Sequence, residues 1–141
     1  MSNELFEYGG DVYVPIETAK LLKEAGFNWR VLMTYRDGVM THQQHCLIDN
    51  YNHKMYQAYE HYSAPSLYTV QKWLREVKHI YVEVNIYPDD NKDQTARYGA
   101  NILRTYIATP EIFKTYEEAL LYGINIALKN IENKHYWMYE T

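Results

Sequence analysis

The residue types that could carry chemistry gather in one stretch, THQQHCLIDNYNHKMYQAYEH, at residues 41–61. It contains the candidate metal ligands His42, His45, Cys46 and His53. Imidazole nitrogen and thiolate sulfur both bind zinc, so a metal site is one interpretation of this stretch. The spacing does not support it, because residues three apart on a strand face opposite ways and no recognised zinc pattern is present. The alternative is a polar connection with surface histidines, and the spacing favours that alternative.

Cys46 is the single cysteine of the chain, and a nucleophilic role is a second interpretation of the same stretch. A catalytic cysteine needs a lowered pKa and a base placed beside it in space. His45 is adjacent only in sequence, which does not make it that base. The chain carries no Ser-His-Asp, P-loop or G-x-G-x-x-G signature. The sequence leaves enzymatic activity open, but it favours a protein that is not an enzyme, with no catalytic residue and no cofactor.

Three cations recur at every third position of the segment SAPSLYTVQKWLREVKH, namely Lys72, Arg75 and Lys78. On a helix they share one face, which could contact a nucleic-acid backbone. Glu76 lies among them, and a solvated helix face is the alternative. The formal net charge of −4 argues against a strong duplex-DNA binder, whose affinity comes from many contacts to phosphate. Weak nucleic-acid binding stays an alternative function.

Tyrosine is unusually abundant, with 16 residues in the chain. Tyrosine and tryptophan combine a large apolar ring with a polar group and often anchor protein interfaces. The candidates for an interaction surface lie in segments without clear periodicity: Tyr51, Tyr56, Tyr59, Tyr62, Tyr136, Trp137 and Tyr139. They predict a contact with a partner protein or a second copy. The alternative is that they cover the core of their own domain.

Local signals predict the elements that position these residues. The segment PIETAKLLKEAGF predicts a helix, with Pro15 at its first position and Gly26 just beyond its end. Before this helix, we expect a loose lead-in over residues 1–11 and a short strand at Val12–Val14.

The pair Asp37-Gly38 between two apolar runs predicts a hairpin with strands at Val31–Tyr35 and Val39–His42. A second helix follows, with Ser66 as its N-cap. Its expected buried stripe is Leu67, Val70, Trp73, Leu74 and Val77.

The last third of the chain reads as a strand, a return strand and a helix. Alternation in IYVEVNIYP predicts a strand that buries Ile80, Val82, Val84 and Ile86. The return strand lies in YGANILRTYIA. Thr115 and Glu118 form a T-x-x-E capping box at the start of the last helix. Gly123 inside that helix either lets a strand approach closely or is merely tolerated. The expected core face of the helix is Ala119, Leu120, Ile124, Ala127, Leu128 and Ile131.

These elements predict an α+β fold, a two-layer sandwich of antiparallel hairpins packed against about three helices in the order α-β-β-α-β-β-α. With 141 residues the chain fits one domain, 1–141, with an irregular insertion at about 43–62. No apolar run reaches the ~20 residues that span a bilayer, and the start has no apolar signal-peptide core. A single cysteine suits a reducing compartment, so we expect a cytoplasmic protein.

Three segments, ETAKLLKEAGF, APSLYTVQKWLREVKHIYVEV and TYEEALLYGINIALKNI, resemble a family of small uncharacterised proteins from gut anaerobes and their phages and prophages. The resemblance covers roughly residues 16–29 and 63–131. The stretch 41–61 is longer and richer in histidine than the pattern of that family. The matching positions are helix caps and core residues, so the resemblance implies a phage or mobile-element origin and a cytoplasmic life. It transfers no catalytic residue.

The expected function is that of a small cytoplasmic accessory protein of phage or prophage type, which acts by protein–protein interaction. Its partner would be another protein or a second copy of the chain. Weak nucleic-acid binding through the second helix is the alternative, and a metal site within residues 42–61 is less favoured. We expect no membrane partner.

Overall fold

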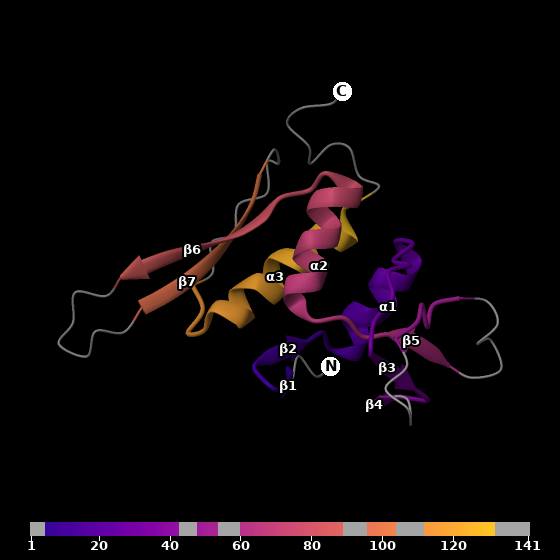
Figure 1. The fold of residues 1–141 in the computed structure, drawn as a ribbon. Coiled ribbons are helices and arrows are strands. Elements are labelled where there is room, and N and C mark those ends of the chain that lie inside the picture. Colours follow the sequence, from indigo (N-terminus) through magenta and orange to yellow (C-terminus); the bar gives the residue numbers. More distant parts are fainter. Residues whose placement is uncertain (1–4, 43–47, 54–59, 89–95, 104–111, 132–141) are drawn as a thin grey trace. The chain divides into compact units, whose positions relative to one another are not determined.

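The computed structural model describes residues 5–42, 48–53, 60–88, 96–103 and 112–131. Contacts between residues divide the chain into two compact units, Met1–Thr69 and Val70–Thr141, and each unit is described by itself. Figure 1 shows the helices and strands in chain order. The prediction of one domain over 1–141, with an insertion at about 43–62, stays a prediction.

The first unit begins with a hairpin that the sequence analysis missed. Strand β1 (Phe6–Tyr8) pairs antiparallel with β2 (Asp11–Tyr13). The turn between them is Gly9-Gly10, with φ of 60° and 85°, which glycine adopts without steric cost. The expected loose lead-in was therefore wrong for the described residues from 5 onward, and the expected strand at Val12–Val14 lies one residue earlier.

The first helix, α1 (Ile16–Glu24), lies where the sequence predicts it. Pro15 was expected as the first helical residue, but it is the N-cap, and the helix begins one residue later at Ile16. Gly26, with φ of 89°, takes the left-handed conformation beyond the helix end, as predicted. The helix buries Ala19 and Leu22 completely, and it packs against strand β5.

A three-stranded antiparallel sheet in the order β4-β3-β5 completes the first unit. The predicted hairpin is confirmed, with a two-residue turn at Asp37-Gly38 whose φ angles are 49° and 86°. Strand β4 (Val39–His42) has the expected bounds, whereas β3 (Met33–Arg36) begins two residues after the expected Val31. Strand β5 (His61–Ser63) was not predicted. It pairs with β3 across a long sequence separation, and the Thr34 hydroxyl strengthens this pairing by donating to the Tyr62 carbonyl at 2.9 Å.

Helix α2 (Leu67–Trp73) crosses the boundary between the two units. Ser66 caps it as predicted, because its hydroxyl accepts a hydrogen bond from the Thr69 N–H at 3.2 Å. The helix then widens into a π-helical turn, η2 (Leu74–Lys78). Each residue of this turn rotates by a smaller angle about the helix axis than a residue of an α-helix does. The expected buried stripe holds as far as Leu74, but Val77 is 45% exposed because the wide turn carries it off the stripe.

The second unit contains the hairpin of β6 (Val82–Pro88) and β7 (Ala96–Ile102), and helix α3 (Tyr116–Lys129) lies against it. The capping-box hydroxyl of Thr115 accepts from the Glu118 N–H at 3.1 Å, as predicted. A Cβ at Gly123 would lie 2.7 Å from Val82 Cγ1 and 2.9 Å from Ala100 Cβ. Of the two explanations for this glycine, close approach of the sheet is therefore confirmed.

Besides Val77, three expected core residues of the second unit are not fully buried, and the first of them, Val84, is half-buried. Ile86, near the far end of β6, is 57% exposed. Ile131 follows the end of α3 and is half-buried.

The fold is of the predicted α+β class, with antiparallel hairpins and three α-helices in the described part of the chain. Within the second unit, α3 and the β6–β7 hairpin form two layers. Among the described residues, none of the helices has the length and apolar character required to cross a bilayer.

Candidate functional site

The four predicted metal ligands do not form a site within the described residues. His45 and Cys46 lie outside the described residues, and His42 is placed only as a position in β4. His53 is exposed at the end of a turn. Within the described ranges, no group of three or more His, Cys, Asp or Glu side chains is positioned to hold a metal ion. The metal site therefore stays a prediction.

The described part of the histidine-rich stretch, residues 48–53, is held firmly in the first unit. Val31 and Asp49 exchange two backbone hydrogen bonds of 2.9 and 3.0 Å. The Asn52 amide donates to the Phe27 carbonyl at 2.9 Å, and its oxygen accepts from the Ser63 N–H at 2.9 Å. These bonds connect the stretch to the segment between α1 and β3 and to strand β5.

Tyr51 lies at the centre of this stretch and is not a surface residue. Its exposed fraction is 0%, and its N–H donates to Ser63 Oγ at 3.0 Å. Burial, with a smaller effect of the Asp49 carboxylate, raises the pKa of its phenol. The assignment of Tyr51 to an interaction surface was wrong, and the alternative, a tyrosine that covers its own core, holds for this residue.

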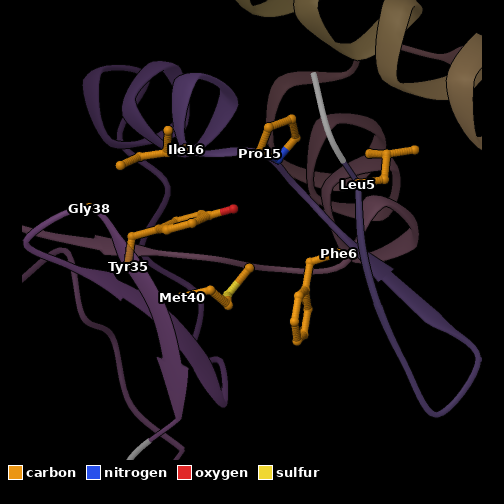
Figure 2. A pocket seen from close by; sticks show the side chains of 7 residues that line it. All are labelled: Leu5, Phe6, Pro15, Ile16, Tyr35, Gly38 and Met40. Atoms are coloured by element: carbon orange, nitrogen blue, oxygen red, sulfur yellow. The ribbon is translucent and has the colours of Figure 1, made fainter. Parts of the chain in front are cut away.

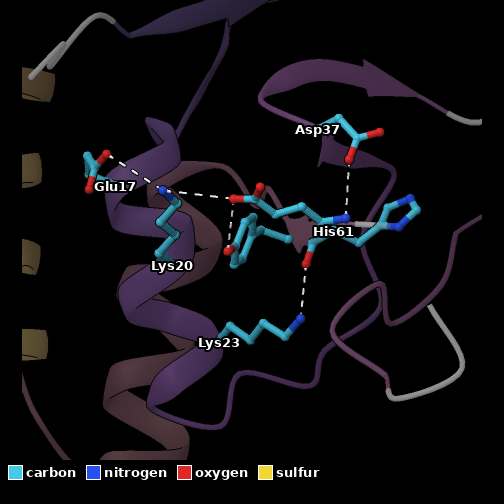
Figure 3. Close-up of polar contacts among 7 residues, drawn as sticks. Glu17, Lys20, Lys23, Asp37 and His61 are labelled. Atoms are coloured by element: carbon cyan, nitrogen blue, oxygen red, sulfur yellow. Dashed lines mark hydrogen bonds and ion pairs between the residues drawn. The ribbon is translucent and has the colours of Figure 1, made fainter. Parts of the chain in front are cut away.

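Tyr62, the other candidate tyrosine in the described part, joins β5 to α1. Figure 3 shows the neighbouring polar contacts of Lys20, Lys23, Asp37 and His61. The Lys23 ammonium lies 5.2 Å from its ring centroid and donates to the His61 carbonyl at 3.1 Å. The Tyr62 hydroxyl donates to Glu60 Oε1 at 3.2 Å. Burial and the Glu60 carboxylate raise the pKa of Tyr62.

Two longer ion pairs complete this cluster. Lys20 Nζ lies 4.0 Å from a carboxylate oxygen of Glu17 and 4.0 Å from one of Glu60. The Glu60 backbone is fixed in turn by Asp37, whose N–H donates to the Glu60 carbonyl at 2.9 Å. Exposed pairs of this length contribute little free energy. The link between α1 and β5 therefore comes mainly from Lys23, through its bond to the His61 carbonyl and its contact with the Tyr62 ring.

The other five candidate aromatic residues belong to parts of the chain that the structure does not describe. Tyr56, Tyr59, Tyr136, Trp137 and Tyr139 lie outside the described residues. Their role at an interaction surface stays a prediction.

The basic face of the second helix is only partly formed. Lys72 and Arg75 are exposed. Lys78 is half-buried, and its ammonium lies 5.5 Å from the ring centroid of Trp73. Residues five apart are neighbours on a π-helical turn. Lys78 therefore lies over Trp73 and not beside Lys72 and Arg75. Nucleic-acid binding through Lys72 and Arg75 stays a prediction.

The first unit carries an apolar pocket that the sequence analysis did not predict (Figure 2). It has a volume of about 310 Å³ and lies between the β1 strand, the start of α1 and the β3–β4 hairpin. Its lining residues are Leu5, Phe6, Pro15, Ile16, Tyr35, Gly38 and Met40. Tyr35 and Met40 are paired across the hairpin, so their side chains stand on the same face of the sheet.

The only side-chain polar group among these seven residues is the Tyr35 hydroxyl. It donates to the Val14 carbonyl at 2.8 Å, so it is already engaged. Burial raises the pKa of Tyr35 to about 12, so the phenol is even harder to ionise than an exposed tyrosine. The lining therefore offers no acid, base or nucleophile. It is suited to an apolar group.

Exposed aromatic surface adjoins the pocket. Phe6 is 40% exposed and Tyr8 is 67% exposed, and both side chains stand on the same face of β1. The Phe6 ring also contacts Tyr13 on the paired strand, with ring centroids 6.1 Å apart. The Gly-Gly turn was the sequence signal for this hairpin. The pocket itself has no local signal, because three separate elements build it.

Comparison with known proteins gives no family assignment. No protein-family model matches the chain, and no curated protein or solved structure shows significant similarity to it.

Proposed function

We propose that this protein works by binding another protein, and that an apolar side chain of the partner enters the pocket beside Phe6, Tyr35 and Met40. The observation that carries this proposal is the composition of the pocket. The side chains that line it are apolar except for the Tyr35 hydroxyl, which is bonded to the Val14 carbonyl at 2.8 Å. An aromatic or branched aliphatic side chain gains most from such a site, because buried apolar anchors dominate the energetics of protein interfaces.

The exposed rings at the pocket support a protein partner. A single large apolar side chain on a surface needs no explanation, but two on one short strand beside this pocket support the proposal of a recognition site. Phe6 and Tyr8 would extend the contact around the inserted anchor. A charged ligand would find no complementary group in the lining.

The biological setting is part of the same proposal. The resemblance of residues 16–29 and 63–131 to small proteins of gut anaerobes and their phages supports an accessory role for a phage or prophage. One cysteine in the chain supports a reducing compartment, the cytoplasm. In this setting, the partner would be a protein of the host or of the phage.

The test compares Met40→Glu with Val39→Glu in an affinity capture from the native host at low salt. Met40 lines the pocket, whereas its neighbour Val39 stands on the opposite face of β4 and is 65% exposed. Both variants add one negative charge to the same strand. We expect the wild type and Val39→Glu to retain the same partner, and Met40→Glu to lose it by about tenfold, since a buried unpaired charge is costly.

Circular dichroism first confirms that both variants are folded. The proposal fails if no protein is enriched over a tag-only control. It fails equally if Met40→Glu captures the partner as well as the wild type does.

A further inference from the structure

The hydrogen bonds of the β6–β7 hairpin show which backbone groups of β6 are free to bind another strand. The Leu103 N–H donates to the Tyr81 carbonyl at 2.9 Å, so this pair is hydrogen-bonded. Along an antiparallel ladder, hydrogen-bonded and non-hydrogen-bonded pairs alternate. Counting in twos from Tyr81, the odd-numbered residues of β6 direct their N–H and C=O groups toward β7. Val84 and Ile86 direct theirs away from it.

Two further contacts agree with this parity. The Gln71 amide donates to the Val82 carbonyl at 2.8 Å, which places Val82 C=O on the outer edge of β6. On the opposite side of the hairpin, Tyr98 and Phe113 exchange backbone bonds of 2.9 and 2.6 Å across the outer edge of β7. The outer edge of β7 is thus paired at Tyr98. In the described ranges, no backbone hydrogen bond reaches the outer edge of β6 beyond Val82.

Free sheet edges are usually blocked by charges, bulges or prolines along the strand. The register of β6 and β7 is continuous from Val82 to Pro88, so β6 has no bulge. Its outward-bonding residues are valine and isoleucine, and Ile86 is 57% exposed. The outward-bonding residues of β6 are therefore apolar and regularly spaced. Only its two ends are blocked, by the bond from Gln71 to the Val82 carbonyl and by the missing N–H of Pro88.

We propose that this edge pairs antiparallel with the same edge of a second copy of the chain, about a two-fold axis that passes between the two copies of Asn85. Val84 of each copy then exchanges both backbone hydrogen bonds with Ile86 of the other. The two hairpins become one four-stranded antiparallel sheet in the order β7-β6-β6-β7. An isologous contact of this kind uses one patch twice and closes as a dimer.

The blocked groups at the two ends select this register. If the axis passed through Val84, Val82 would pair with Ile86 of the other copy and would need its carbonyl, which already accepts from Gln71 at 2.8 Å. If the axis passed through Ile86, Val84 would pair with Pro88 of the other copy, and proline has no N–H to donate. Only the register centred on Asn85 uses, on both strands, pairs of N–H and C=O groups that no hydrogen bond from another described residue occupies.

The side chains fit this register on both faces of the sheet. On the face toward α3, Val84 lies directly opposite Ile86 of the second copy, which covers the exposed isoleucine with an apolar cross-strand pair. On the other face, Glu83 lies opposite Tyr87 of the second copy, so no like charges meet. Arg97 is the β7 neighbour of that Tyr87, which brings a cation within two strands of Glu83.

The test uses disulfide trapping in a Cys46→Ser background, because Cys46 is the single native cysteine. At a non-hydrogen-bonded antiparallel pair, the two Cα atoms are about 4.5 Å apart, which suits a disulfide. Asn85→Cys places two thiols at this distance on the axis. Glu83→Cys is the matched control, because its two copies lie four residues apart along the paired strands, about 13 Å.

Under mild oxidation of each purified variant, we expect Asn85→Cys to form a covalent dimer at least about tenfold faster than Glu83→Cys. A mixture of Glu83→Cys with Tyr87→Cys should form the mixed dimer, because those positions face each other across the axis. The mixture also keeps the test decisive if Asn85→Cys fails to fold. Equal rates for Asn85→Cys and Glu83→Cys, or a mixture that gives no excess of the mixed dimer, would overturn the proposal.

Discussion

At the scale of single residues, Gly123 decides how closely α3 can approach the hairpin of the second unit. Its missing side chain leaves room that Val82 Cγ1 and Ala100 Cβ occupy, at 2.7 and 2.9 Å from the position of a Cβ. Glycine inside a helix costs about 1 kcal/mol relative to alanine. Glycine is needed at this position because the sheet and the helix are in direct contact there, with no room for a Cβ.

Gly123→Ala should therefore destabilise the protein by about 1–3 kcal/mol, because overpacking outweighs the gain in helix propensity. Chemical denaturation gives the free energy of unfolding. In a double-mutant cycle, adding Val82→Ala should recover part of the loss, since it removes the nearest methyl groups. If Gly123→Ala stabilises the protein, the close approach is incorrect.

Tyr35 gives the protein a dependence on alkaline pH. Burial raises its pKa from 10.0 to about 12. Above pH 10 the unfolded chain loses this proton and the folded chain keeps it, so the stability from this group, complete below pH 10, falls as the pH rises toward 12. Three other tyrosines with raised pKa values, Tyr13, Tyr51 and Tyr62, add to the same trend.

Tyr35→Phe should make the loss of stability between pH 10 and 12 shallower than in the wild type. At neutral pH the variant should be less stable by about 1 kcal/mol, because the hydrogen bond to the Val14 carbonyl is lost. Denaturation at a series of pH values measures both effects. Parallel curves for the two proteins would contradict the assignment of the raised pKa to Tyr35.

At the scale of elements, the structure separates what local sequence can predict from what it cannot. The turn Asp37-Gly38 and the cap Thr115 were predicted correctly, because neighbouring residues determine both features. Strand β5 was missed because its partner is distant: Thr34 bonds to the Tyr62 carbonyl, 28 positions away. The π-helical turn at Leu74–Lys78 was missed because its residues have the pattern of an ordinary helix.

The same reason explains the candidate sites. The pocket is built from β1, α1 and the β3–β4 hairpin, so no single segment indicates it. Tyr51 was misassigned because burial depends on contacts with Ser63 and its surroundings, which the alternation of nearby residues does not reveal.

The cap of α3 offers a test at this scale. Thr115→Ala should destabilise the protein by about 1 kcal/mol, since the Glu118 N–H loses its acceptor at 3.1 Å. Thr115→Ser keeps the hydroxyl and should stay within a few tenths of a kcal/mol of the wild type. Thermal unfolding of the three proteins checks the ranking. Equal destabilisation by alanine and serine would show that the hydroxyl does not act as the cap.

At the scale of the whole molecule, the two proposed contacts belong to different units. The pocket lies within residues 1–69, and the free edge of β6 lies within residues 70–141. Sites without shared residues contribute independently to the free energy. The protein would then combine a site for another protein with a site for its own copy.

Met40→Glu should therefore leave the rate of disulfide trapping at Asn85→Cys unchanged, within about twofold. Asn85→Cys should likewise capture the partner as the wild type does when it is kept reduced. The two measurements, made on the same set of variants, show whether the functions are separate. A large loss of trapping in Met40→Glu would mean that the two sites are coupled.

The wide turn at Leu74–Lys78 also bears on how the chain tolerates a change in length. A π-helical turn holds about one residue more than an α-helical turn. Deletion of one residue from this turn should therefore leave a regular α-helix, and the helix before Leu74 would keep its position.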